Sequence, residues 1–287
     1  CSTVLEQVKF RNHIKEEMDW GKNGIFVNYS DLHDYSWNYT SDNNKISGFN
    51  KGIVTKTVPI VIHCNSDAEG LVLKNKLLEI GEKDILAVQH GKLIIGDYYL
   101  KCFIRGSKKG KYLMRKGYME TTLSIVTDYP QWVKESTTSF RADGRVTTDG
   151  QTSGDKVGGK NLDFKRDFPY DYTSDMTNKT LNNTGFVGTN FKLIIYGAAI
   201  NPTVHIGGHT YQVNCSVGDG EYLTIDSLEK TIYLTKQDGT TVNCFNQRNR
   251  ASYVFEQIPS GQNTVTWDNT FGFDVILLEE RSEPRWT

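Results

Sequence analysis

The chain has 287 residues, with 33 Lys and Arg against 34 Asp and Glu. At roughly 100–200 residues per domain, this length predicts two domains. The balanced charge argues against a strongly basic surface that neutralises DNA phosphates, and no apolar run reaches the roughly 18 residues of a membrane span. The first residues, CSTVLEQVKF, lack the apolar segment of a signal peptide, and Cys1 followed by Ser2 leaves a lipidated mature N-terminus open.

The clearest element of the first half is a helix. A β-branched run at 58–64 predicts a strand, and Ser66 with Glu69 then forms the capping box that opens a helix. Leucines follow at helical spacing as far as Gly81, a residue typical of the position just after a helix. We therefore expect one helix over residues 67–80.

Strands resume after this helix. We expect them at 85–89, at 92–106 after a turn at His90-Gly91, and at 118–128, where apolar and polar side chains alternate as in a half-buried strand. A basic loop at 108–111 separates the last two strands. This order of strands, helix and strands lacks the repeated βαβ units of a parallel sheet.

The composition changes after the first half. Residues 136–165 place glycines among Thr, Ser, Asp and Lys without apolar periodicity, which indicates a linker or a long exposed loop. We therefore expect a first domain over 1–135, a linker over 136–165 and a second domain over 166–280.

The second half predicts an antiparallel β-sandwich between about Phe186 and Glu280. Short apolar runs alternate with strong turn signals, notably Gly207-Gly208 and Asp238-Gly239. Regular spacing without a helical pattern is typical of a sandwich or a barrel. The expected strands are 191–197, 203–206, 209–213, 221–226, 230–236, 240–245, 252–258, 263–267 and 273–280.

No catalytic or metal site stands out in this pattern. His205 and His209 have the spacing of zinc ligands on a helix, but they flank a hairpin turn and no H-E-x-x-H is present. Glycoside hydrolysis needs a defined pair of carboxylates. The acidic residues near the expected strand ends supply no such pair: Asp219, Glu221, Glu279, Glu280 and Glu283. We expect no enzyme, no catalytic residue, no metal and no cofactor.

The five cysteines contain no C-x-x-C pair, so neither a zinc knuckle nor a thioredoxin motif is supported. Cys64 and Cys102 are interpreted as small apolar residues of strands. A Cys215–Cys244 bridge stays open.

Three features bear on binding. Trp267, Tyr222, Tyr233 and Phe271 are candidates for a sugar-stacking platform, although aromatic side chains more often belong to a core. The basic loop, with Arg105 and Arg115, could face nucleic acid, but exposed lysines are the commoner explanation. Glycosylation sequons matter only if the chain enters a secretory pathway, and they begin, for example, at Asn28, Asn38 and Asn178.

Several segments in both halves carry a resemblance to a known family. They are GYMETTLSIVTDYPQWVKE (117–135), RDFPYDY (166–172), FKLIIYGAAINPTVHIGGHTYQV (191–213), EYLTIDSLEKTIYL (221–234), IPSGQNTVTW (258–267) and EERSEPRWT (279–287). In order and spacing they resemble the siphophage distal tail proteins, the Dit or Sipho_tail family. The resemblance covers most of the chain.

This resemblance implies a fold and a role. The first domain would be a tail-tube-like β-structure with one helix that closes into a hexameric ring between the tail tube and the tail hub. The second would be a galectin-like β-sandwich that carries receptor-binding or other baseplate proteins and, in some members, touches host saccharides. Residues 281–287 would return to the first domain. The family shares no catalytic residues, so none is transferred.

The implied setting is the virion, at the tail tip or baseplate, after synthesis in the host cytoplasm. The implied partners are further copies of this chain, the tail tube protein, and the tail hub or tail-associated lysin, while genomic DNA would pass through the lumen without specific binding. Two other classes stay open: a secreted or surface carbohydrate-binding β-sandwich, and a β-sandwich hydrolase.

Overall fold

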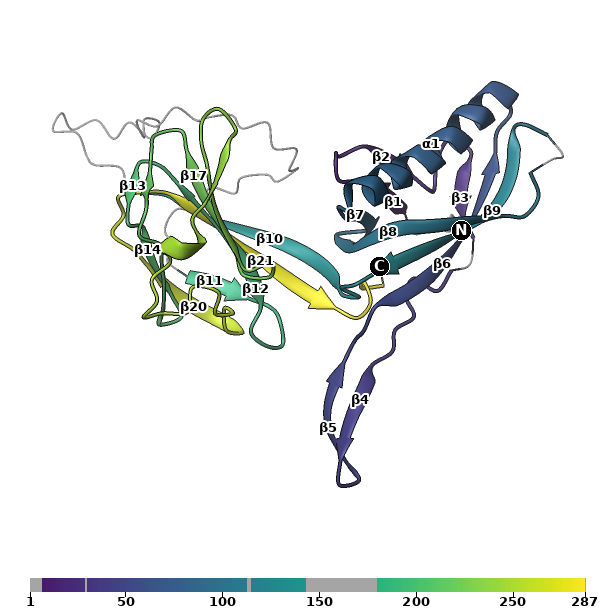
Figure 1. Cartoon of the computed structure of the whole chain (residues 1–287). Coiled ribbons are helices and arrows are strands. Elements are labelled where there is room, and N and C mark those ends of the chain that lie inside the picture. The colour runs from purple at the N-terminus through teal and green to yellow at the C-terminus, as the bar shows by residue number, and fades with distance from the viewer. Residues whose placement is uncertain (1–6, 29, 113–114, 143–179, 287) are drawn as a thin grey trace. The chain divides into compact units, whose positions relative to one another are not determined.

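The computed structural model describes residues 7–28, 30–112, 115–142 and 180–286. The chain divides into two compact units: the first contains Cys1–Lys134 and Glu280–Thr287, and the second contains Glu135–Glu279. The protein is mainly β, and α1 is the single α-helix of the described ranges (Figure 1), which confirms the predicted fold class. No helix within these ranges has the length and apolar character needed to span a bilayer.

Antiparallel strands build the first unit around one long strand, β8 (Tyr98–Lys109). Its other strands are β1 (Val8–Arg11), β2 (Glu17–Asp19), β3 (Ile25–Val27), β6 (Val54–His63), β7 (Gly91–Ile95), β9 (Tyr118–Thr127) and the start of β10 (Trp132–Phe140). The first half of β8 pairs with β7 and the second half with β9, on either side of an irregularity between Ile104 and Gly106. One long strand therefore joins the row β2-β1-β7-β8-β10 to the row β3-β6-β9-β8.

Helix α1 (Asp67–Ala87) packs on β8 and β6. The Ser66 side chain accepts a hydrogen bond from the Glu69 N–H at 3.3 Å, which confirms the predicted start of the helix. Its buried face includes Leu77 and Ile80, so burial of one apolar stripe holds the helix in place.

The predicted helix end at residue 80 is wrong. Gly81 is buried inside the helix, where an added Cβ would lie 2.9 Å from the Cβ of Ile104. This glycine therefore permits close packing of α1 on β8 instead of ending the helix. The helix ends at Ala87, and the left-handed Val88 (φ 52°) caps it, so the predicted strand at 85–89 is also wrong.

Two further boundaries of the first unit differ from expectation. The predicted strand at 92–106 is two strands, β7 and β8, because a turn with a left-handed Gly96 (φ 55°) interrupts it. The predicted basic loop at 108–111 starts too early, since Lys108 and Lys109 still pair with β9.

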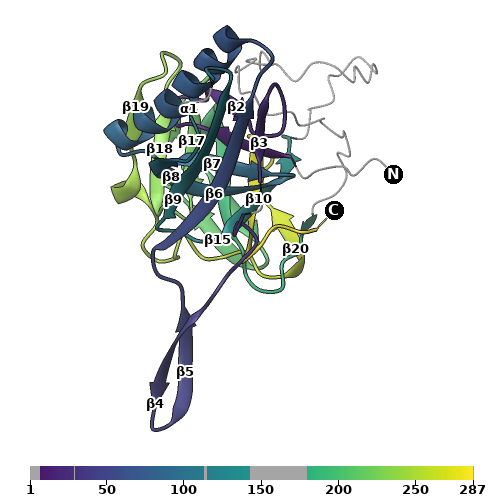
Figure 2. The ribbon, with the colours of Figure 1, turned by 90° about the vertical axis from the view of Figure 1, so that its right-hand side faces the viewer.

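A hairpin that the sequence did not predict lies before β6. It consists of β4 (Asn38–Asp42) and β5 (Lys45–Asn50). Asn43 and Asn44 form the turn with φ values of 48° and 60°, the backbone of a type I′ turn that asparagine tolerates. Figures 1 and 2 show the hairpin extending away from β6 and the other strands of the first unit.

The second unit is an antiparallel sandwich, as predicted. The strands are β11 (Thr180–Asn183), β12 (Asn190–Tyr196), β13 (Ala199–Ile200), β14 (Thr203–Ile206), β15 (His209–Gln212), β16 (Ser216–Val217), β17 (Tyr222–Asp226), β18 (Thr231–Thr235), β19 (Thr241–Asn243), β20 (Gly261–Thr266) and β21 (Phe273–Arg281). One sheet has the order β19-β18-β17-β12-β21 and the other β11-β20-β14-β15. Their inner faces share one core that includes Phe191, Leu223 and Tyr211.

The predicted linker at 136–165 begins too early. Residues up to Phe140 continue β10, and Phe140 is buried in the core of the second unit, stacked on Phe273 at 4.9 Å. Apolar burial thus extends this strand past the expected boundary. Residues 143–165 of the predicted linker, and 166–179 of the predicted domain, lie outside the described residues.

The predicted strand at 252–258 is also wrong. The Glu256 N–H donates to Tyr253 O at 3.0 Å, which is a turn hydrogen bond inside the expected strand, and the neighbouring residues Val254 and Phe255 are both buried. Carbonyls of this segment accept hydrogen bonds from side chains, including one from the Tyr211 hydroxyl to Glu256 O at 2.9 Å. The predicted strand at 240–245 is shorter than expected, because the 3-10 helix η1 (Phe245–Gln247) follows β19.

Candidate interaction surfaces

The two candidate zinc histidines do not form a site. His205 lies on β14 opposite Thr210, and its Nδ1 lies 3.0 Å from Thr210 Oγ1. His209 is the next residue before Thr210, so its side chain leaves the opposite face of the sheet, and its Nε2 lies 2.9 Å from Tyr253 O. Within the described ranges, no group of three or more His, Cys, Asp or Glu could hold a metal ion.

The candidate carboxylates have separate structural partners. Glu221 accepts a hydrogen bond from the Gly218 N–H at 2.9 Å, within its own turn. Glu280 accepts one from the Tyr129 hydroxyl at 2.6 Å, and Glu283 lies 3.9 Å from His33 Nδ1. These contacts fix loops and the C-terminal segment, and they do not assemble an acid with a nucleophile.

The four cysteines at 64, 102, 215 and 244 are free thiols. Cys102 is completely buried, which raises the pKa of its thiol to about 12. Burial, with the neighbouring Cys244, raises the pKa of the Cys215 thiol to about 11. These thiols are therefore protonated at neutral pH and are poor nucleophiles.

The candidate aromatic platform is dispersed across the second unit. Phe271 is buried in the core, and Tyr222 and Tyr233 lie on β17 and β18 of the five-stranded sheet. Trp267 follows β20 of the other sheet and lines a shallow pocket of about 280 Å³. The remaining residues around this pocket, which the sequence did not bring together, are Asn201, Thr203, His205, Thr266 and Asp268.

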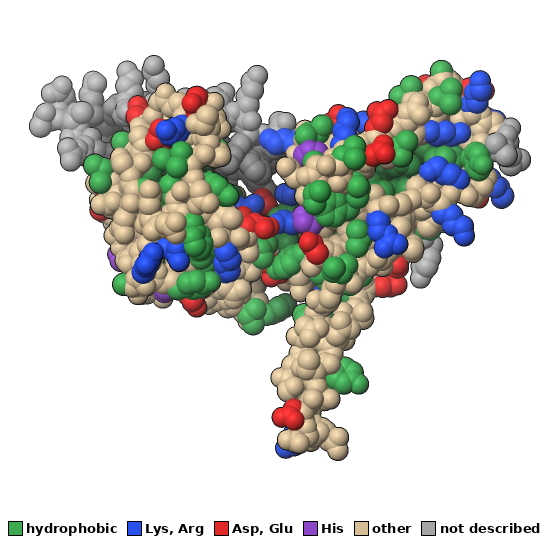
Figure 3. Space-filling view, viewed as in Figure 1, with side chains coloured by type: hydrophobic (Ala, Val, Ile, Leu, Met, Phe, Trp, Pro, Cys, Tyr) green, Lys and Arg blue, Asp and Glu red, His purple; other side chains and the backbone are tan. Residues whose placement is uncertain are grey.

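The β4–β5 hairpin carries an exposed apolar face. Tyr39 pairs with Phe49, and a bulge next to Thr40 brings Ile46 opposite Ser41. Because side chains alternate between faces, this register places Tyr39, Ile46 and Phe49 on the same face. They are 65%, 60% and 63% exposed, and Figure 3 shows apolar side chains on the hairpin surface.

The C-terminal segment closes over the base of this hairpin. Lys51 Nζ donates to Ser282 Oγ at 2.8 Å and to Pro130 O at 3.3 Å, and it lies 4.4 Å from the centroid of the Trp37 ring. His33 stacks on Trp286 with ring centroids 4.0 Å apart. Burial, together with the charge of Lys56, lowers the pKa of Lys51 to about 8.

Helix α1 carries the second exposed apolar surface of the first unit, in addition to the hairpin face. Leu71, Leu78 and Ile85 are seven residues apart and are 42%, 59% and 40% exposed. Residues at this spacing lie on one side of a helix, here beside the face that packs on β8. The first unit therefore has two separate apolar surfaces, one on the hairpin and one on the helix.

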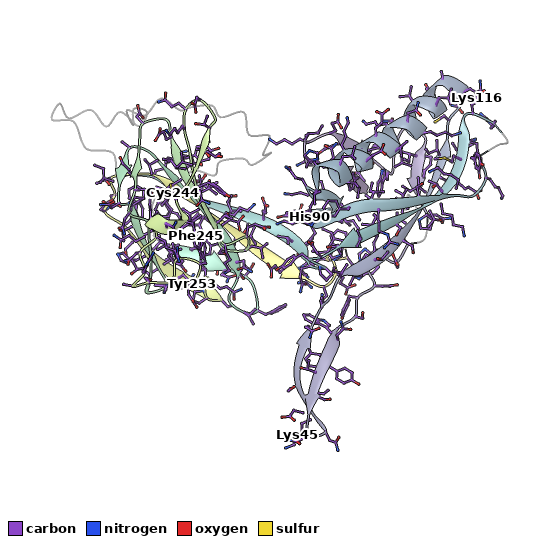
Figure 4. The ribbon with its side chains drawn as sticks, in the orientation of Figure 1. Lys45, His90, Lys116, Cys244, Phe245 and Tyr253 are labelled. Atoms are coloured by element: carbon purple, nitrogen blue, oxygen red, sulfur yellow. The ribbon has the colours of Figure 1, made fainter. Side chains whose placement is uncertain are left out.

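The second unit carries a cluster of cations and aromatic rings, and Figure 4 labels two of its members, Phe245 and Tyr253. Lys230 Nζ lies 5.5 Å from the ring centroids of both Tyr253 and Phe255. Phe255 stacks on Phe245, and the Arg248 guanidinium lies 4.0 Å from the Phe245 centroid. Tyrosine and arginine are enriched where protein interfaces gain most of their binding energy.

The candidate basic segment forms local contacts. Lys111 Nζ lies 3.6 Å from Glu120 Oε1, and Arg115 donates to Cys64 O at 3.0 Å. Among the sequons, Asn38 starts the exposed hairpin, and Asn178 lies outside the described residues.

The fold was compared with those of known proteins. No protein-family model matches the sequence, and no curated protein matches it either. A chain of the phage P2 baseplate in its activated conformation with Ca matches with a TM-score of 0.63 and 12% identity, over 98% of this chain and 100% of that chain. The same baseplate with Sr gives the same values.

A second solved structure, the Dit protein of phage SPP1, matches with a TM-score of 0.54 and 8% identity, over 96% of this chain and 99% of that chain. It is described as a paradigm of the hub adsorption apparatus in phages that infect Gram-positive hosts. Both matches extend over the two units. The chain therefore has the fold of the phage baseplate and Dit proteins, along almost its whole length.

Proposed function

We propose that this chain is a structural component of a phage tail tip, a distal tail protein that forms a ring between the tail tube and the tail hub. The observation that carries the proposal is the likeness to a P2 baseplate chain and to SPP1 Dit over at least 96% of this chain. A likeness limited to the second unit would equally suit any β-sandwich. Its extension over both units favours the baseplate role, and the role proposed is not enzymatic.

The surfaces of the first unit support ring formation. A ring of identical subunits requires two different patches that bind each other head to tail, and the unit exposes one apolar patch on the hairpin and another on α1. A two-stranded ribbon is marginally stable alone in water. The apolar face of Tyr39, Ile46 and Phe49 is therefore covered by a second copy of this chain in the proposed ring.

The ring would be hexameric and would enclose a lumen through which DNA passes. The near-balanced total of 33 basic and 34 acidic residues suits passage without tight binding, because tight binding depends on phosphate neutralisation. The cluster of Tyr253, Phe255, Phe245, Lys230 and Arg248 supports a docking role for the second unit, toward receptor-binding or accessory baseplate proteins.

The proposal is tested by mass photometry and negative-stain imaging of the purified chain, alone and mixed with the tail tube and hub proteins of the same virus. We expect a discrete assembly of about six copies with a central pore. A chain that stays monomeric at micromolar concentration, and that joins neither the tube nor the hub protein, would contradict the proposed role.

A further inference from the structure

The outward face of the sheet β11-β20-β14-β15 is polar but bears no Lys, Arg, Asp or Glu on its described strands. The inward positions, such as Leu181, Val204 and Val265, belong to the core. The alternate positions that face outward carry hydroxyl, amide or imidazole groups, and they are Thr180, Asn182, Gln262, Thr264, Thr266, Thr203, His205, Thr210 and Gln212. Such a face offers many hydrogen bonds without a net charge.

The pocket of about 280 Å³ lies at one end of this face, where β14 and β20 pair. His205 stands directly opposite Thr266, and Thr203 lies two residues before it on the same face. Asn201 from the preceding turn, and Trp267 with Asp268 from the end of β20, complete the lining. This volume of about 280 Å³ is just below the range of about 300–1,000 Å³ that is usual for ligand pockets, so it suits a single ring and not an extended molecule.

The orientation of Trp267 is fixed before any ligand binds. Its Nε1 donates to Phe271 O at 3.0 Å. Its ring makes perpendicular contacts with Phe273 at 5.1 Å and with Phe140 at 5.9 Å. Trp267 remains partly buried and lines the pocket, and because these contacts hold its side chain in place, little conformational entropy is lost on binding.

The polar side chains of the pocket are also oriented. Nδ1 of His205 is hydrogen-bonded to Thr210 Oγ1. The other ring nitrogen, Nε2, is therefore the one that can face a ligand. Asp268 Oδ1 accepts hydrogen bonds from Thr270 N at 3.0 Å and from Thr270 Oγ1 at 2.8 Å. The second carboxylate oxygen of Asp268 can then accept a hydrogen bond from a ligand hydroxyl.

We infer that this pocket binds one ring of a neutral saccharide. The apolar face of a sugar ring can pack on Trp267, while its hydroxyls match the donors and acceptors of Asn201, Thr203, His205, Thr266 and Asp268. No Lys or Arg lines the pocket and one carboxylate does, so an anionic sugar or a phosphate is disfavoured. The site lies within the second unit and does not depend on the proposed ring.

The test uses the full chain and saturation-transfer NMR, with dissociation constants from calorimetry. The probes are neutral oligosaccharides of glucose, galactose, rhamnose and N-acetylglucosamine, and the anionic comparison is glucuronic acid and polyglycerol phosphate. We expect at least one neutral probe to bind in the millimolar range or tighter. Absence of binding by every neutral probe, or preferential binding of the anionic ones, overturns the inference.

Variants locate the binding. His205→Ala and Asp268→Asn should each weaken the neutral probe by about tenfold or more, as expected when one ligand hydrogen bond is lost. Asp268→Asn keeps an oxygen for the Thr270 turn, and both variants avoid Trp267, whose removal would disturb the core. Gln262→Ala, on the same face but outside the pocket lining, is the matched control and should bind as the unchanged chain does. Equal affinity in all three variants would move the sugar site elsewhere and overturn the assignment.

Discussion

The β4–β5 hairpin of the first unit and the outward face of β11, β20, β14 and β15 in the second unit are both exposed antiparallel strands. The hairpin places Tyr39, Ile46 and Phe49 in solvent, whereas the sheet face presents threonines, amides and His205. Exposed apolar area is stabilised when another protein covers it, whereas a polar face is already stable in water. Exposure alone therefore does not define a protein interface, because side-chain chemistry distinguishes a surface suited to another subunit from one suited to a small polar ligand.

The largest expected effect concerns the hairpin. The double variant Ile46→Ser, Phe49→Ser should abolish the assembly seen by mass photometry, because it removes the apolar face that a neighbouring copy would cover. The stability of the monomer should change by less than about 0.5 kcal/mol, since both residues are exposed. The matched control is Thr40→Ala with Lys45→Ala, on the other face of the hairpin. If the control dissociates the assembly and the double variant does not, the assignment of the faces is wrong.

The next effect tests the two sides of the sheet in the second unit. Ile206 is completely buried, so Ile206→Ala should lower the free energy of unfolding by about 2–5 kcal/mol through lost burial and a cavity. Thr264→Ala on the outward face should change it by less than about 0.5 kcal/mol. Urea unfolding of both variants checks the difference. Equal losses would mean that the outward face is packed against something and is not a solvent surface.

A smaller effect is expected where the C-terminal segment contacts the rest of the first unit. Tyr129→Phe removes the hydrogen bond of 2.6 Å to Glu280, which should cost about 1 kcal/mol. Hydrogen exchange should also become faster in residues 280–286, because one of their attachments is lost. Tyr233→Phe, at a tyrosine that is 39% exposed, serves as the control. Unchanged exchange in Tyr129→Phe would show that Lys51 and His33 hold the segment without it.

The smallest effect concerns the charge of Lys51 at the base of the hairpin. Its pKa is lowered from 10.5 to about 8, first by burial and then by Lys56. Between these two pH values the unfolded chain binds more protons than the folded chain, so stability should rise with pH. The unfolding free energy of the unchanged chain minus that of Lys51→Met should therefore increase from about pH 8 to 10.5. Lys51 is only partly buried, so solvent screening keeps this increase small, and a decrease would refute the lowered pKa.

Local patterns predicted the elements whose signals lie within a few residues. Ser66 and Glu69 mark the start of α1 correctly, and Gly207-Gly208 forms the predicted turn between β14 and β15, with φ values of 59° and 84°. Turn and cap chemistry depends on neighbouring backbone groups. The sequence pattern therefore contains most of the information for these elements.

The predicted element boundaries were wrong where residues that are distant in the sequence determine the local structure. Gly81 reads as a helix end, but Ile104 of β8 packs against it and the helix continues to Ala87. Val254 and Phe255 read as part of a strand, but the sandwich core buries both in an irregular segment. Local propensity is a weak prior that tertiary packing overrides.

Hydrophobic periodicity and turn residues act locally, so the mainly β class, the helix after residue 66 and the sandwich in the second half could be read from the amino-acid pattern. Which exposed residues lie together depends instead on how the strands pair. Register aligned Tyr39, Ile46 and Phe49 on one face of the hairpin. Pairing of β14 with β20 brought His205 and Thr266 beside Trp267. Residues about 60 positions apart in the chain meet there through strand pairing, which no local pattern encodes.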